Sequence, residues 1–231
     1  MTNILIRWIQ LSLYGYLINC KECFRYLKII RHFYHNTSFA ITDLKLHWHY
    51  LWNNPYHLCQ KSRHYLPKAL TQPYGETPLL DFSKLIHHLH LTEKDRFIEL
   101  GCGRGHLVFW LAHFTPCAIL AVDIVPEFIR YGNRLAQQRH LSQLHFDYSN
   151  MLAVDFSTAS CVYLYGTSLK DEYIIQLVKK LSDLPNGAKV ITVSYSLSEY
   201  GAENFIVEKR LLADFIWGQS YFYIQKKVSQ L

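Results

Sequence analysis

The sequence is poor in the residues that mark several special classes of protein. Only 18% of its 231 residues are charged, 10 are Gly and 7 are Pro, which excludes a disordered, collagen-like or low-complexity chain. Cysteine is scarce as well: 6 residues show no spacing of a disulfide framework, which excludes a disulfide-dense mini-protein and suits a reducing compartment. No secretory signal is visible at the N-terminus, so we expect a cytoplasmic protein.

What the chain does contain is apolar and aromatic. Half of its residues belong to the apolar set and 15% are aromatic. A chain of this length buries about 70–75% of its unfolded surface. The sequence therefore predicts a sizeable core, in one large domain with an appendage or in two small domains.

Positive charge is concentrated in the first third of the chain. Residues 1–73 hold nine Lys or Arg and two Asp or Glu, a net of +7, whereas residues 74–231 hold 15 and 16, a net of −1. The basic third would face an anionic partner such as a membrane surface, a nucleic acid or an acidic protein. We place a domain boundary here, between an N-terminal helical extension (1–73) and a second domain (74–231).

The run from Ile4 to Cys20 is apolar on nearly all faces but includes Arg7. Basic residues continue to position 31 on a helical pattern. Three interpretations stay open: a membrane span with a basic flank, a helix lying in the membrane interface, or a helix packed on the domain. Association with a membrane surface through residues 4–31 is thus one expectation, and the sequence leaves the oligomeric state open.

Residues 32–73 are rich in His, Trp and Tyr, but none of the histidines has the spacing of a metal site. We interpret this segment as aromatic and histidine packing under a cap. Cys20 and Cys23 form a C-x-x-C pair without a second half, which we interpret as two thiols on a helix. No metal site is predicted.

After residue 73 the hydrophobic pattern becomes regular, and strands alternate with helices. This alternation predicts an α/β fold with a mostly parallel sheet covered on both faces, and the final strand pair predicts an antiparallel edge. Strands are expected at 96–100, 118–124, 144–148, 161–165, 189–195, 205–213 and 221–227. Helices are expected at 79–91, 106–114, 126–140 and 170–182.

The first of these strands runs directly into a glycine-rich turn. Residues 97–105 read FIELGCGRG, in which Glu99 precedes a G-x-G-x-G pattern that a helix follows. Such glycines permit a sharp turn and let a ligand approach the backbone, and the helix N-terminus offers free N–H groups. Asp123 closes the second strand, where nucleotide-binding α/β units place an acid against ribose hydroxyls.

These motifs resemble the class I S-adenosylmethionine-dependent methyltransferases over residues 74–231. FIELGCGRG matches the first motif and AVDIVP (121–126) the second. YGETP (74–78) looks like a loop of the non-SET histone lysine methyltransferases, and CVYLYGTSL (161–169) is similar to segments of those enzymes and of mitochondrial lysine methyltransferases that act on inner-membrane proteins. The resemblance implies a Rossmann-like, seven-stranded sheet with helices on both faces.

The resemblance also implies S-adenosylmethionine as the cofactor and assigns residues to it. Glu76 and Thr77 would hold the methionine end, Asp123 the ribose, and Asn150 with Met151 the adenine. Asn150 stands where Asp is common, a mild departure because an amide both accepts and donates hydrogen bonds. The full cofactor set is Tyr74, Glu76, Thr77, Glu99, Gly101, Gly103, Gly105, Asp123, Ile124, Asn150, Met151 and Tyr165.

The methyl acceptor implied by the resemblance is a lysine side chain of a protein. Tyr165 and Tyr74 are the candidate catalytic residues, because aromatic walls would favour the uncharged amine. Tyr163 and Trp110 are interpreted as core residues. An RNA, lipid or quinone acceptor remains an alternative, as does a membrane-tethered scaffold without activity.

Overall fold

The computed structural model of the chain describes residues 20–62 and 74–229. Most of the apolar run considered above as a membrane segment, residues 4–19, lies outside this part. No helix among the described residues combines the length and apolarity needed to cross a bilayer.

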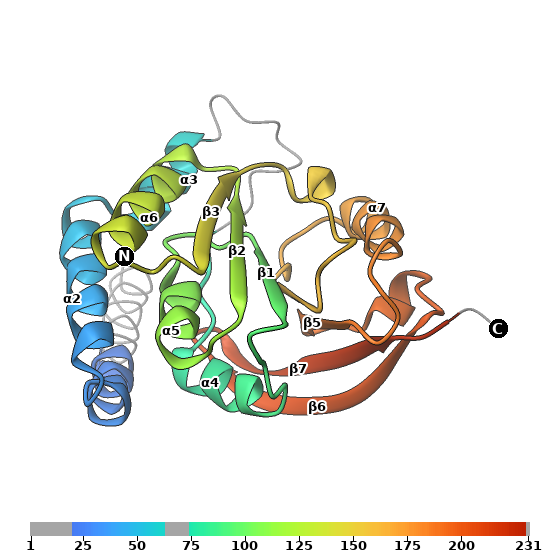
Figure 1. The fold of residues 1–231 in the computed structure, drawn as a ribbon, viewed down its shortest axis with the longest axis horizontal. Helices are drawn as coiled ribbons and strands as arrows, with labels where there is room; N and C mark the ends of the chain where they lie inside the picture. Colours follow the sequence, from blue (N-terminus) through green and yellow to red (C-terminus); the bar gives the residue numbers. More distant parts are fainter. Residues whose placement is uncertain (1–19, 63–73, 230–231) are drawn as a thin grey trace, which may run out of the picture.

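The centre of the molecule is one seven-stranded sheet (Figure 1). The strands are β1 (Arg96–Leu100), β2 (Ala118–Asp123), β3 (Leu144–Tyr148), β4 (Cys161–Leu164), β5 (Lys189–Val193), β6 (Phe205–Phe215) and β7 (Gly218–Lys227). Their order is β3-β2-β1-β4-β5-β7-β6. The first five are parallel, and β7 pairs antiparallel with both β5 and β6. The predicted parallel sheet with an antiparallel edge is confirmed.

Helices lie on both faces of this sheet, as predicted. The first described helix covers residues 20–33. The others are α2 (Thr37–Trp52), α3 (Pro55–Ser62), α4 (Leu79–His87), α5 (His106–Phe114), α6 (Pro126–Gln138) and α7 (Asp171–Leu181), with short 3₁₀ turns η1 (Met151–Ala153) and η2 (Leu197–Tyr200).

The central strands β1, β4 and β5 are mostly apolar because both of their faces are buried. Along β1, Phe97 points into a cluster with α4, α5 and α6, whereas Ile98 and Leu100 point into a second cluster with α7. Tyr163 and Trp110 are 1% and 2% exposed, which confirms them as core residues. The two clusters fix the sheet between its helical layers.

The N-terminal helices share the first of these clusters. Phe33 and Phe39 pack edge-on against Phe114, and Phe33 also contacts the indole of Trp110. Residues 20–62 are therefore packed into the same core as the sheet. The boundary at residue 73 stays a prediction.

The observed elements differ from the predicted ones mainly at their ends. The helix predicted to reach Leu91 stops at His87, and His90 adopts a positive φ of 51° in the turn before β1. The final hairpin is longer than predicted, because strand pairing continues to Phe215 and resumes at Gly218. This length brings the hairpin turn to the functional edge of the sheet.

Candidate functional site

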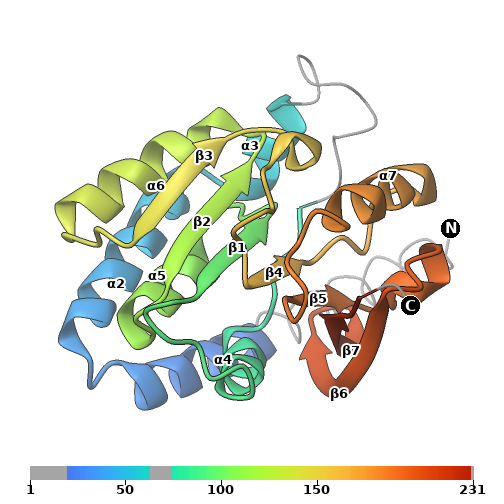
Figure 2. The ribbon, with the colours of Figure 1, turned by 45° about the vertical axis from the view of Figure 1, so that its right-hand side comes forward.

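The candidate site lies where β1, β2 and β4 end. In Figure 2 the arrowheads of β1, β2 and β3 point toward α3. The glycine-rich turn follows β1, and the amides of Gly101 and Cys102 donate to the carbonyl of Val122 at 2.8 and 3.0 Å. Gly101 has a φ of 78°, and a Cβ there would meet no atom within 4 Å. The turn thus presents bare backbone to a pocket.

Asp123 holds this turn against the next strand. Its Oδ2 accepts from the amide of Gly103 at 2.8 Å, and its Oδ1 accepts from the amide of Val125 at 2.9 Å. Burial raises the pKa of Asp123, although these backbone hydrogen bonds oppose the shift. An ionised carboxylate offers about four acceptor positions, and the amide of Ile124 also contributes a backbone hydrogen bond, so at least one position remains for a ligand.

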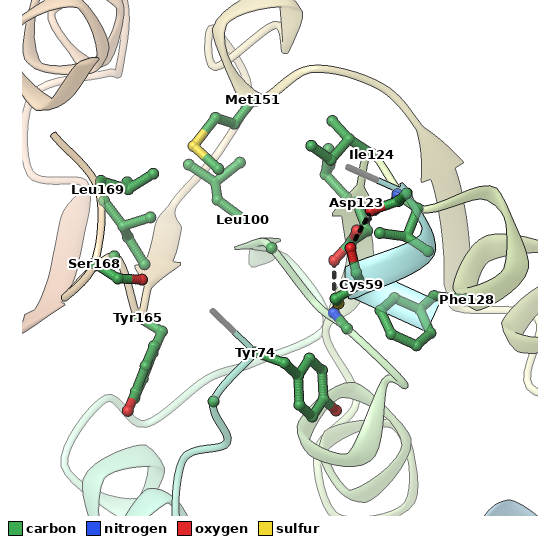
Figure 3. A pocket seen from close by; sticks show the side chains of 18 of the residues that line it. Cys59, Tyr74, Leu100, Asp123, Ile124, Phe128, Met151, Tyr165, Ser168 and Leu169 are labelled. Atoms are coloured by element: carbon green, nitrogen blue, oxygen red, sulfur yellow. Dashed lines mark hydrogen bonds between the residues drawn. The ribbon is translucent and has the colours of Figure 1, made fainter. Parts of the chain in front are cut away.

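The walls of the pocket are largely apolar (Figure 3). Met151 and Leu100 lie on one side, and Ile124 and Phe128 lie around Asp123. Figure 3 shows Tyr165 on the opposite side of the pocket from Asp123. The pocket therefore combines a carboxylate, open backbone and flat apolar walls.

The loop at 74–78 closes one side of the site. The Tyr74 ring lies over Gly103, where a Cβ would come within 2.8 Å of it, and its hydroxyl donates to Glu76 Oε1 at 2.6 Å. Glu76 in turn meets Arg104 of the glycine-rich turn: Nη2 donates to Oε2 at 2.8 Å, and Nε lies 2.6 Å from Oε1. Burial opposes ionisation of Glu76, but Arg104 outweighs it and lowers the pKa to about 2. The loop is thus tied to the turn by a charged pair.

Glu99 is a buried acid that lacks a full set of partners. Its side chain lies at the end of β1, only 4% of the residue is exposed, and Oε2 has no hydrogen-bond partner. Burial, with the neighbouring Asp123 and Glu76, raises the pKa of Glu99 well above its usual value. A cationic group reaching this carboxylate would satisfy it.

Tyr165 follows β4 and forms the other wall with the final hairpin. Its hydroxyl accepts from Trp217 Nε1 at 2.8 Å, and its ring lies 5.9 Å from that of Phe215. Phe215 and Trp217 are stacked at 5.0 Å, and Trp217 is 51% exposed. Our sequence analysis assigned no role to Trp217. The position of this aromatic residue next to Gly218, at the turn of the hairpin, was the signal that could have identified it.

The structure brings together most of the predicted cofactor residues. Those that line the pocket are Tyr74, Gly101, Gly103, Asp123, Ile124, Met151 and Tyr165. Those that do not line it are Glu76, Thr77, Glu99, Gly105 and Asn150.

Three residues of the second group are held by other parts of the protein, outside the pocket lining. Thr77 is buried and shares a hydrogen bond with the hydroxyl of Tyr163. Gly105 caps α5 with a φ of 80°. Asn150 Oδ1 accepts from the amide of Leu152 at 2.9 Å and from the hydroxyl of Tyr173. Their predicted contacts with the cofactor stay predictions.

These residues fit S-adenosylmethionine by their chemistry. The orphan carboxyl of Glu99 suits an ammonium group, the remaining acceptor capacity of Asp123 suits ribose hydroxyls, and Met151 with Ile124 suits an adenine ring. Residues 20–62 and 74–229 contain no group of three His, Cys, Asp or Glu arranged to hold a metal ion.

Comparison with known proteins agrees with this chemistry. Residues 91–171 match the family model described as a methyltransferase domain. The chain is 29% identical over 102 residues to methyltransferase phqN of Penicillium fellutanum, covering 44% of this chain and 29% of phqN. It is 25% identical over 166 residues to the H3 lysine-79 specific histone-lysine N-methyltransferase of Dictyostelium discoideum, covering 62% of this chain and 9% of that protein. The chain thus spans less than a third of either relative.

The fold is also found among solved structures. An RNA methyltransferase from Salinibacter ruber, solved with S-adenosyl-L-homocysteine, superposes with a TM-score of 0.56 at 18% identity. The match covers 68% of this chain and 95% of that one. The chain therefore has the Rossmann-like class I methyltransferase fold, and its residues 91–171 match a methyltransferase domain.

Proposed function

We propose that this protein transfers a methyl group from S-adenosylmethionine to a lysine side chain of another protein. The observation that carries the proposal is the aromatic wall of Tyr165 and Trp217 beside the cofactor pocket. Such a wall admits a long apolar stem and disfavours its charged end.

The chain's own residues would contribute binding and alignment. The cofactor supplies an electrophilic methyl group on a sulfonium, and the attacking amine needs a free electron pair in line with the breaking S–C bond. Among the described residues that line the pocket there is no His, and the only carboxylate is Asp123. Desolvation near Tyr165 would promote loss of the lysine proton to solvent before transfer.

The open side of the pocket favours a macromolecular acceptor. Trp217 sits at the turn of the final hairpin with half of its surface exposed, so an acceptor can reach it without entering the core. The loop sequence YGETP and the partial similarity to a histone-lysine methyltransferase also support a protein lysine.

A small apolar acceptor is the second candidate. The pocket walls around Met151, Leu164 and Leu169 are apolar, which would equally suit a lipid or quinone. An RNA acceptor has less support, because the described residues that line the cofactor pocket include no Lys or Arg.

The test is incubation of the purified chain with S-adenosylmethionine carrying a labelled methyl group, together with a cell lysate. We expect label in protein, recovered by mass spectrometry as methyl-lysine, and none with the Asp123→Ala variant. Label found only in RNA or in the lipid extract would overturn the lysine proposal, but it would still support methyl transfer by this domain.

A further inference from the structure

Helix α2 carries a second apolar face that no described residue covers. Its buried side includes Phe39, Leu46 and Tyr50, which lie roughly opposite the second face at about 100° per residue. The residues of the second face are Ile41, Leu44, Trp48, Leu51 and Trp52, which we call the α2 stripe. The stripe spans about three helical turns. It is therefore a continuous apolar surface, unlike the single exposed apolar residues that are common on soluble proteins.

Exposure along the stripe rises toward the end of the helix. Ile41 is 44% exposed, Leu51 is 70% exposed and Trp52 is 79% exposed. The sequence interpretation of this segment as aromatic packing under a cap is therefore wrong for Trp48 and Trp52, although Tyr50 does pack in the core. Two adjacent turns expose an indole each, a pattern common where a helix meets the headgroup region of a bilayer.

Unpaired positive charge lies on α2 and on the helices next to it in the chain. Lys45 lies beside Trp48 on the helical wheel, and Lys28, Arg31 and Lys61 are also exposed. None of the four has a carboxylate within ion-pair distance among the described residues. The acid of α2, Asp43, is buried and adds no charge to this surface.

The neighbouring helix over residues 20–33 has the same mixed character. Phe24 and Leu27 are 67% and 54% exposed, and they alternate with Lys28 and Arg31. This helix packs against α2, since the ring of Tyr26 lies 4.7 Å from that of His47. Apolar residues interleaved with basic ones suit lipid tails and anionic headgroups together. The aliphatic members of the surface, Leu27 here and Leu44 and Leu51 on α2, would give the bases of a nucleic acid no flat ring to stack on.

We propose that the α2 stripe is a docking surface for an anionic membrane, with its indoles in the headgroup region and the nearby basic side chains on lipid phosphates. The stripe ends close to the candidate site: α3 follows directly, and its residues Cys59 and Ser62 line the cofactor pocket. Docking here would hold the site near the membrane surface. The inference stands independently of the methyl acceptor.

The experiment is flotation of the full chain with phosphatidylcholine vesicles, with and without phosphatidylglycerol. We expect binding that depends on phosphatidylglycerol and weakens with added salt. The Trp48→Ser/Trp52→Ser double variant should partition onto the vesicles at least about tenfold less, because each substitution removes a large apolar contact with lipid. The matched control is Ile206→Ser/Leu212→Ser, since both residues are over half exposed on β6, away from α2.

Other results would overturn the proposal. Wild-type partitioning by the Trp48/Trp52 double variant would mean that any membrane contact lies elsewhere, and absence of wild-type binding would remove the docking surface itself. A drop in melting temperature of the double variant, with unchanged lipid binding, would mean that another segment of the chain covers the stripe. A change in its oligomeric state by light scattering, again with unchanged lipid binding, would assign the stripe to a second copy.

Discussion

Arg104 of the glycine-rich turn reaches Glu76 of the 74–78 loop, and two of its nitrogens lie 2.6 and 2.8 Å from the two carboxylate oxygens. The Nη2 contact is a charge-assisted hydrogen bond, and the Nε contact adds a close ion pair. The pair joins the glycine-rich turn, which lines the pocket, to the 74–78 loop, which closes one side of it. The pair therefore ties the loop to the glycine-rich turn.

Replacing Arg104 with Ala should loosen this loop. The loss of charge-assisted hydrogen bonds costs about 1.5–3 kcal/mol each, and we expect the affinity for S-adenosylhomocysteine to fall at least about tenfold by calorimetric titration. Lys84→Ala, which removes an exposed pair with Asp81, is the control and should bind normally. Unchanged affinity in Arg104→Ala would mean that the loop position does not depend on the pair.

Asp123→Ala should also weaken cofactor binding. Beyond any ribose contact, the substitution removes the acceptor for the amides of Gly103 and Val125. One or two charge-assisted bonds of about 1.5–3 kcal/mol predict a loss of roughly tenfold or more in affinity for S-adenosylhomocysteine. Asp147→Ala on β3 is the control, because Asp147 does not line the pocket. Equal affinities for both variants would refute the ribose assignment.

Glu99→Gln should change the pH dependence of stability and of binding. The raised pKa means that the folded carboxyl keeps its proton above the unfolded value of about 4.3. Wild-type stability is therefore lost as pH rises from there through the folded pKa, whereas the Gln variant avoids this loss. Denaturant unfolding across pH should show the variant gaining stability relative to wild type.

The same substitution should act in the opposite direction on the ligand. An ammonium group near Glu99 favours the ionised carboxyl, so S-adenosylhomocysteine should bind wild type more tightly as pH rises and release a proton. The Gln variant should bind weakly and without this pH trend. A parallel trend in both proteins would place the ammonium elsewhere.

Asp43→Ala should destabilise the fold. Asp43 Oδ2 accepts from the hydroxyls of Tyr26 and Tyr34, and Oδ1 lies 3.2 Å from His106 Nε2 and 3.3 Å from His47 Nδ1. Removing one partner of a buried charged network costs about 3–5 kcal/mol. Denaturant unfolding measures the loss. The exposed Asp155→Ala control should unfold like wild type.

Trp217→Phe should separate acceptor binding from cofactor binding. The change keeps an aromatic ring but removes the N–H that donates to Tyr165. We expect kcat/KM for the protein acceptor to fall several-fold, while affinity for S-adenosylhomocysteine stays constant. Tyr221→Phe, on the exposed surface of β7, is the control. A loss of cofactor affinity in Trp217→Phe would assign the indole to the cofactor instead.

Sequence reasoning located the sheet closely, and the reason is physical. Buried parallel strands need continuous apolar runs, and glycine or proline marks where such runs stop, so β1 begins and ends where predicted. Asp123 was predictable in the same way, because the end of a strand fixes which edge of the sheet its side chain reaches.

Contacts between distant segments were not predictable in this way. Glu76 and Arg104 lie 28 residues apart, and nothing in either segment encodes their distance. Trp217 reaches Tyr165 only because the hairpin is longer than its apolar pattern suggests. Trp48 and Trp52 read as core residues by composition, and only the packing of α2 puts them on the surface.

The shared core of the N-terminal helices has a practical consequence for expression. A shortened version starting at residue 74 would lose Phe33 and Phe39 and uncover Trp110 and Phe114, leaving a sticky aromatic patch. Aggregation is the expected fate of such a product. The N-terminal helices therefore cannot be removed as an independent unit. An exchange of these helices between homologues would also need the matching surface on α5.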